Sequence, residues 1–419
     1  MKPAAKDVLE HLQSKREDMV RLLHSMTAAE SPSDVPGAQH EIREIIAVEF
    51  ERLGFLVRRV PGHSSGGMLH ARPANKKNGA AAQLILGHYD TVWPLGTLDE
   101  MPFEHDGDTV RGPGVYDMKA GVAQALLAME TMQYFGYEPE VVPHVFLNSD
   151  EEIGSRESRR YIESLAPHMN RVFVLEPSLG PTGLLKTARK GIGRFTVTVK
   201  GEAAHAGLDP GAGASAILEL SHVIQALFAL NDFDRGITVN VGTIDGGLRP
   251  NVVAPESTAV IDVRVASQED ADRVEAAILG LEPAIEGTTL EIEGHFGRPA
   301  MERTPANRQL WHLACSLGNE LGLQLEEGLA GGGSDGNFTS LYTATLDGMG
   351  GFFILKEIGA FSAAEQARLW GSPREGIIDL GSQPRARLTA GDFESIASAD
   401  GVNALRLYED EPDVGRLAL

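Results

Sequence analysis

The sequence has little of several features that would assign it to a specialised class of protein. It contains a single cysteine, Cys315, and cannot form an intrachain disulfide, which fits a reducing compartment. Lys and Arg number 37 against 59 Asp and Glu, and the net charge of −22 argues against nucleic acid or an anionic membrane as a partner. No uninterrupted apolar run approaches the roughly 20 residues of a membrane span. Residues 1–26 lack the apolar core of a signal peptide, so we expect a cytoplasmic protein.

The first part of the chain alternates between strand and helix patterns. With 419 residues, 42% of them hydrophobic, the chain is long enough for two domains. Apolar runs at residues 83–86, 143–147 and 171–175 predict strands, and helical patterns alternate with them. Such alternation is typical of an α/β layered domain, in which ligands gather at the ends of the strands.

The pattern changes at residue 190. Apolar and polar residues alternate over 193–200, which predicts a half-buried antiparallel strand. The elements that follow have the order β-α-β-β-α-β, a compact split unit of the ferredoxin-like kind. We therefore expect an inserted α+β domain at residues 190–303 within a discontinuous α/β domain of residues 1–189 and 304–419. The stretch 351–419 has no clear pattern of secondary structure.

A run of three acids, Asp150, Glu151 and Glu152, follows the apolar segment 141–147. Carboxylates at the end of a strand are costly to bury unless a cation meets them. Other potential metal ligands lie just after a predicted strand or at the start of a helix, and these are His88 with Asp90, Asp117, and Glu176.

Each of these positions also has an ordinary structural interpretation. His88 beside Asp90 can be a structural pair, Asp117 can cap a helix, and the acidic run can be a solvated turn. Taken together, nitrogen and oxygen donors at successive strand ends match what a pair of zinc ions needs, with one carboxylate bridging both. Glu151 is not needed as a ligand, and a carboxylate in that place can remove a proton from a zinc-bound water. The pattern therefore favours hydrolysis of an amide.

Five segments occur in the order found in one enzyme family. They are HYDTV at 88–92, GVYDMKAG at 114–121, SDEEIGS at 149–155, EP at 176–177 and GEAAHAG at 201–207. In this order they resemble the co-catalytic di-zinc peptidases that include glutamate carboxypeptidase, acetylornithine deacetylase and succinyl-diaminopimelate desuccinylase. The resemblance covers about residues 10–350 and is strongest to the glutamate carboxypeptidase branch.

The resemblance implies a role for each residue of the acidic centre. His88 and Glu176 would bind one zinc, Glu152 the other, and Asp117 would bridge the two. Asp90 would orient His88, and Glu151 would be the general base.

The resemblance also implies that the inserted domain dimerises and covers the site. His205 would reach the site of the partner subunit and stabilise the oxyanion. Asn251, Arg264 and Arg298 would bind a carboxylate of the substrate, and the amide of Gly332 would approach an anion closely. Each arginine has a surface ion pair as its ordinary alternative.

One departure from the family concerns the second zinc. The family has a final His that binds the same zinc as Glu152, whereas this sequence has no His beyond His312. A tail acid such as Glu357 or Asp379 could replace it, but no pattern in the sequence selects either. Two zinc ions are expected from the family, and the ligand set of one of them is incomplete here.

These observations predict a zinc metallopeptidase that releases a C-terminal, acidic amino acid such as glutamate from a small molecule or short peptide with a free carboxylate. An N-acyl-amino-acid deacylase of the same family is the first alternative. The second is a catalytically silent homodimer that binds metal or peptide, because the last ligand His is missing.

Overall fold

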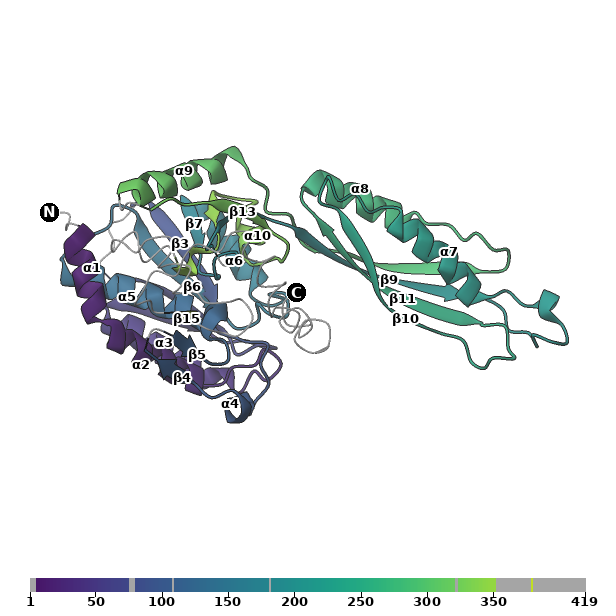
Figure 1. Ribbon diagram of the computed structural model, residues 1–419, viewed down its shortest axis with the longest axis horizontal. Helices are drawn as coiled ribbons and strands as arrows, with labels where there is room; N and C mark the ends of the chain where they lie inside the picture. Colours follow the sequence, from purple (N-terminus) through teal and green to yellow (C-terminus); the bar gives the residue numbers. More distant parts are fainter. Residues whose placement is uncertain are drawn as a thin grey trace, which may run out of the picture. The chain divides into compact units, whose positions relative to one another are not determined.

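The computed structural model describes residues 5–74, 80–107, 109–180, 182–320, 323–351 and 378–379. The chain divides into two compact units. Unit 1 comprises Met1–Thr187, Thr304–Gly328 and Ser334–Leu419, and unit 2 comprises Ala188–Arg303 and Leu329–Gly333. Both units can be followed by colour in Figure 1, where unit 2 is the teal and green segment that carries α7 and α8.

Unit 1 is built on a six-stranded sheet with the order β1-β2-β6-β3-β7-β14. The strands β6, β3, β7 and β14 run parallel, and the hairpin β1-β2 adds two antiparallel strands at one edge. The strand bounds are β1 Phe55–Val60, β2 Met68–Pro73, β3 Ala82–His88, β6 Val142–Asn148, β7 Arg171–Val174 and β14 Thr345–Leu346. All seven residues of β3 are buried, as expected for a central parallel strand.

Helices cover both faces of this sheet. On one face, Ile85 of β3 packs in a core with residues of α2, α3 and α5, while Leu84 and Leu86 pack on the other face with Ile162 of α6 and Phe338 of α10. The helix bounds are α1 Ala5–Ser14, α2 Arg16–Ala28, α3 Gln39–Arg52, α4 Thr97–Glu100, α5 Ala120–Tyr134, α6 Arg159–Leu165, α9 Pro305–Glu320 and α10 Gly336–Thr339. Because neighbouring residues of a strand point to opposite faces, β3 contributes to both cores.

The described residues also form two smaller sheets. Strand β4 (Glu104–Asp106) pairs with β5 (Thr109–Arg111), and β5 also pairs with β15 (Ile378–Asp379). A further pair joins β8 (Leu185–Arg189) and β13 (Glu327–Ala330).

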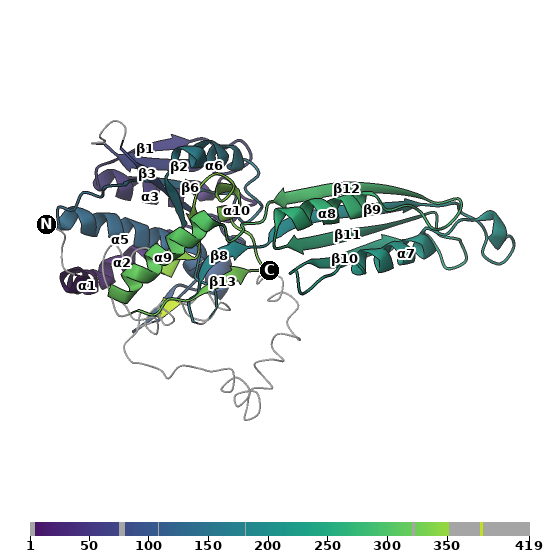
Figure 2. The same ribbon diagram turned by 90° about the horizontal axis from the view of Figure 1, so that it is seen from above.

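Unit 2 is an antiparallel sheet with the order β10-β11-β9-β12 and two helices (Figure 2). Its elements are β9 Gly191–Lys200, α7 Ala216–Phe228, β10 Thr238–Gly246, β11 Glu256–Val265, α8 Gln268–Leu279 and β12 Thr289–Arg298. Alternate residues of β9 and β11 are buried, and they form one core with both helices. Ser215 and Ser267 cap the two helices by accepting hydrogen bonds from Leu218 N and Asp270 N.

The predicted fold class, a layered α/β domain with an inserted β-α-β-β-α-β domain, is confirmed. Within the described residues, no helix has the length and apolar character needed to cross a membrane.

Candidate metal centre

The candidate site lies at the carboxyl ends of the parallel strands of unit 1. His88 is the last residue of β3, Glu151 and Glu152 follow the end of β6, and Glu176 follows β7. Because β3 pairs in parallel with both β6 and β7, these ends meet at one edge of the sheet. Asp117 comes from the turn Val115–Lys119 that leads into α5, and its peptide bond to Met118 is cis.

The imidazole of His88 is buried and held on one side by Asp90. Its Nδ1 lies 3.1 Å from the carbonyl oxygen of Asp90 and 3.3 Å from the Oδ1 of the same residue. A proton on Nδ1 satisfies these acceptors and leaves the lone pair on Nε2, which is the arrangement of metal-binding histidines.

The other ring nitrogen of His88 points at two carboxylates. Nε2 lies 3.3 Å from Asp117 Oδ1 and 3.5 Å from Glu176 Oε1. Both His88 Nε2 and Asp117 Oδ1 are buried, and neither has a hydrogen-bond partner among the described residues. Buried polar atoms are rarely left in this state, and a divalent cation between a nitrogen and carboxylate oxygens would satisfy them. The residues present therefore fit a metal ion.

Two groups of side chains bring one ligand atom each to within 4.8 Å of one another. One group is His88, Glu151 and Glu176, and the other is His88, Asp117 and Glu152. The structure thus gathers the five residues for which the sequence predicted ligand or base roles. Glu151 lies as close to His88 and Glu176 as a ligand would, so its role as a base stays a prediction.

Asp90 connects three parts of the site. Besides facing His88, its carboxylate accepts hydrogen bonds from Ser33 Oγ (2.7 Å) and from the backbone amides of Glu151 (3.3 Å) and Glu152 (3.2 Å). One fully buried carboxylate therefore positions the imidazole and the turn that carries both glutamates.

Burial and neighbouring groups shift the pKa values at this centre. Burial alone would lower the pKa of His88, but its contacts with Asp117, Asp90 and Glu176 raise it well above the ordinary 6.5. Burial, followed by the charge of Asp117, raises the pKa of Glu152 well above 4.5. Burial acts to raise the pKa of Asp90, yet contacts with His88 and Ser33 lower it overall. A divalent cation would favour the charged form of the carboxylates and the neutral form of His88.

Asp150, which had no role in the sequence analysis, has a structural one. Its Oδ2 accepts hydrogen bonds from the backbone amides of Glu157 (2.7 Å) and Ser158 (3.2 Å), just before α6 begins. The first acid of the run thus fixes the loop that follows the two candidate metal-site glutamates.

Sequence reasoning missed several residues that support the centre. Ser33 bonds to Asp90, and Gln39 donates from Nε2 to the carbonyl oxygens of Pro32 and Ser149, both at 2.9 Å. Asp335 accepts from Asn148 Nδ2 at 2.6 Å and also from Ser155 Oγ. Except for the bond from Gln39 to Pro32, these bonds join segments far apart in the chain, and no local pattern of residues predicts them.

Three predicted residues belong to exposed or half-buried parts of unit 2. His205 is exposed, and its Nδ1 accepts from the amides of Gly207 and Leu208, both at 3.1 Å. Asn251 is also exposed, and its carbonyl oxygen accepts from Ala206 N. Arg264 forms a two-point ion pair with Asp262, at 2.8 and 3.0 Å, which is the kind of contact that its ordinary alternative describes.

The other two predicted substrate residues lie at the ends of unit 2 segments. Arg298 ends β12 and is buried. Gly332 is exposed, and its carbonyl oxygen accepts from Arg189 Nη1 at 3.1 Å. A Cβ at Gly332 would meet nothing within 4 Å, so the space beside this backbone is open. The roles in substrate binding stay predictions.

The two tail acids that could replace the missing His are described to different extents. Glu357 lies outside the described residues. The backbone of Asp379 pairs with Thr109 in β5, and its side chain is outside the description.

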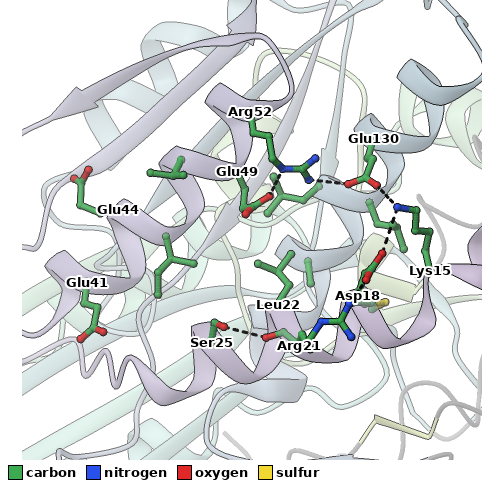
Figure 3. A pocket seen from close by; sticks show the side chains of 16 residues that line it. Lys15, Asp18, Arg21, Leu22, Ser25, Glu41, Glu44, Glu49, Arg52 and Glu130 are labelled. Carbon is green, nitrogen blue, oxygen red and sulfur yellow. Dashed lines mark hydrogen bonds and ion pairs between the residues drawn. The ribbon is translucent and has the colours of Figure 1, made fainter.

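A cavity of about 820 Å³ lies elsewhere in unit 1, between helices α2, α3 and α5 (Figure 3). Several of the residues that line it form ion pairs. Glu130 pairs with Lys15 (2.9 Å) and with Arg52 (2.7 Å), and Arg52 also pairs with Glu49 (2.8 Å). None of the candidate site residues is among the described residues that line it. The pair of Arg52 and Glu130 joins α3 to α5, and the candidate metal centre is separate from this cavity.

Comparisons with known proteins identify similar peptidases. Residues 187–281 match the model of the peptidase dimerisation domain of the M20 family. Over 305 residues the chain is 30% identical to carboxypeptidase G2 of Pseudomonas sp. strain RS-16, which covers 71% of this chain and 72% of the relative.

Solved structures show the same fold. An aminopeptidase, PepT from Bacillus cereus, superposes with a TM-score of 0.64 at 20% identity, covering 79% of this chain and 89% of that one. An M20 family metallo-carboxypeptidase from Sulfolobus solfataricus gives 0.61 at 16% identity, covering 87% and 95%. With a metal-binding set of His, Asp and Glu at the strand ends and this degree of identity to a peptidase, the chain belongs to the M20 family of metallopeptidases.

Proposed function

We propose that this metallopeptidase is a zinc-dependent carboxypeptidase that releases a C-terminal, acidic amino acid such as glutamate. The observation that carries the proposal is the buried Nε2 of His88, which faces Asp117 and Glu176 without a hydrogen-bond partner among the described residues. Family membership implies a divalent metal, and the nitrogen and oxygen donors of this set suit zinc.

His88, Asp117, Glu152 and Glu176 would hold the metal. When bound, zinc polarises the scissile carbonyl and makes a nearby water more acidic. Glu151 takes a proton from that water as its oxygen adds to the carbonyl carbon. As the C–N bond breaks, the same carboxyl group returns the proton to the leaving amine. Asp90 keeps Glu151 in place through the bond to its backbone amide.

The choice of a carboxypeptidase rests on the relative with the highest identity cited above, which is named as one. A carboxypeptidase must bind the free carboxylate of its substrate, and an arginine fork suits that group because it can donate two parallel hydrogen bonds. Arg298, which is buried at the end of β12, and Arg264 are the candidates for this role. Asn251 and the open backbone at Gly332 are further candidates.

We further propose that the protein works as a homodimer through unit 2. The match of residues 187–281 to a peptidase dimerisation domain supports this assembly. His205, exposed on unit 2, would then act on the substrate in the partner's site as an oxyanion donor.

The test is hydrolysis by purified protein of peptides and N-acyl derivatives that end in glutamate, compared with matched substrates ending in glutamine or lysine. We expect turnover of the glutamate substrates, loss of turnover on chelation, and recovery with zinc. Equal turnover of all three would overturn the acidic preference and leave the peptidase. Cleavage of N-acetyl amino acids in preference to peptides would favour the deacylase. Binding of zinc without turnover of any of these substrates would favour the silent dimer.

A further inference from the structure

A buried lysine lies behind one of the candidate metal ligands. Lys186 of β8 places its Nζ 3.7 Å from Oε2 of Glu176, whereas the other oxygen of the same carboxylate, Oε1, lies 3.5 Å from His88 Nε2. The side chains of Lys186 and Glu176 are each only 8% exposed. The two oxygens of Glu176 therefore face different groups. Oε1 faces Nε2 of the His88 imidazole, and Oε2 faces the ammonium group of Lys186.

The ammonium is held in place by a second carboxylate. Asp347 Oδ1 lies 3.9 Å from Lys186 Nζ, and Asp347 Oδ2 accepts a 2.5 Å hydrogen bond from Ser334 Oγ. The backbones of Lys186 and Asp347 also bond to each other in both directions, at 2.9 and 3.1 Å. Asp347 is fully buried, so Lys186 starts from a fixed backbone and lies between two fixed carboxylates.

The way in which a carboxylate binds a metal decides how many positions remain for other ligands. A carboxylate can bind through one oxygen or through both. A catalytic zinc site keeps one position open, and groups around the ligands orient them.

We propose that Lys186 is a positioning residue that retains Oε2 of Glu176, so that Glu176 binds the metal through Oε1 alone and a coordination position stays open. This inference rests on the proposed function, because it presumes a metal beside His88. It differs from a purely structural role, in which Lys186 would serve only to neutralise the buried Asp347.

The test uses protein loaded with one equivalent of cobalt(II), whose visible absorption falls when its coordination number rises. We expect Lys186→Met to lower this absorption, because Glu176 becomes free to bind through both oxygens. Lys186→Arg should retain the wild-type spectrum, since it keeps the charge. Competition with a chromogenic chelator should show about a 10-fold or larger change in cobalt affinity for Lys186→Met.

Asp347→Asn is the matched control, because it removes the other partner of Lys186. We expect it to lower the unfolding temperature and to change the cobalt spectrum less than Lys186→Met does, because the ammonium and the backbone bonds of Lys186 remain. If Lys186→Met fails to fold, Lys186→Gln, judged by the same spectrum, replaces it. A wild-type spectrum and affinity in the uncharged variant would overturn the role of Lys186 while leaving the proposed function intact. A wild-type protein that binds neither cobalt nor zinc would overturn both.

Discussion

The two units differ in how their sheets bury side chains. In unit 1, every residue of β3 is buried, and both faces of the sheet are covered by helices. In unit 2, β11 buries every second residue, and both helices pack in one core with its inward side chains. A sheet covered on both faces can enclose polar groups at its strand ends, and this is where unit 1 gathers His88 and its carboxylates.

The two units can also be compared through one buried carboxylate from each. The carboxylate of Asp90 in unit 1 accepts hydrogen bonds from two backbone amides and one hydroxyl, and it also faces His88. Glu219 in unit 2 accepts the amides of Ala284 and Ile285 and the hydroxyl of Thr288, so its described bonds are those of a loop anchor. Burial and hydrogen bonding are common to both carboxylates, and contact with a histidine of the candidate metal centre distinguishes Asp90.

The largest effect is expected at Glu151. We predict that Glu151→Gln lowers turnover by about 100- to 10,000-fold, because the amide cannot accept the proton of water. Metal content, measured by elemental analysis, should stay at the wild-type value. Loss of metal from this variant would show instead that Glu151 is a ligand, as its closeness to His88 and Glu176 allows.

The next effect tests whether unit 2 contributes to the chemistry. We expect His205→Ala to lower turnover by about 100-fold through loss of an oxyanion donor. The free energy of unfolding should fall by only about 1 kcal/mol, because the side chain is exposed and accepts hydrogen bonds from the amides of Gly207 and Leu208. His222→Ala, which removes another exposed histidine of unit 2, is the control and should leave turnover unchanged. Equal turnover in both variants would restrict the chemistry to unit 1.

The third prediction concerns the orienting role of Asp90. Asp90→Asn should weaken zinc binding by about 10- to 100-fold, because the charged acceptor that holds Nδ1 of His88 is lost. Competition with a chromogenic chelator measures the affinity. An unchanged zinc affinity would show that Asp90, like Glu219, serves as a loop anchor.

The fourth prediction concerns Glu219, for which we expect an effect on stability and none on zinc binding. We expect Glu219→Gln to reduce the free energy of unfolding by about 2 kcal/mol, because hydrogen bonds to a buried carboxylate are replaced by weaker ones. Zinc affinity should not change. Glu286→Gln, at an exposed position of the same loop, should alter stability by less than about 0.5 kcal/mol in denaturant titrations.

The smallest effect is a pH dependence in unit 2. Burial acts to raise the pKa of Asp270, but hydrogen bonds from Arg273, Ser267 and Arg235 lower it below the ordinary 3.8. The folded state therefore gains stability from this carboxylate above pH 3.8 and loses it as the pH falls through the lowered folded-state pKa. We expect a contribution of no more than about 1 kcal/mol, because both arginines are partly exposed. Asp270→Asn should flatten the acid limb of stability against pH, and an unchanged limb would contradict this assignment.

Much of the fold could be predicted because periodicity is a local property. The alternation over 193–200 and the apolar runs at 83–86 and 143–147 correspond to β9, β3 and β6. The antiparallel hairpin β1-β2 was not predicted, since its pattern is mixed with charged residues that face solvent. The stretch from 352 to 377 and from 380 to 419 lies outside the described residues.

The metal centre was predictable only in part, for a related reason. Its potential ligands follow strands that could be recognised, so His88 and Glu176 stood out from the sequence. Their supports come from elsewhere in the chain, since Ser33 is 57 positions from Asp90 and Gln39 is 110 positions from Ser149. Lys186 was missed because a lysine in a strand carries no sign of being buried beside a carboxylate.

The hydrogen bonds of Ser33 and Gln39 have a consequence for any shortened form of the protein. Neither residue is a candidate ligand, and both precede the first residue of the central sheet. A version that begins after α3 would keep every predicted zinc ligand, yet Asp90 would lose the Ser33 hydroxyl and Ser149 the amide of Gln39. The segment from Ser33 through α3 therefore belongs to the smallest segment that can be expected to hold the metal centre in its shape.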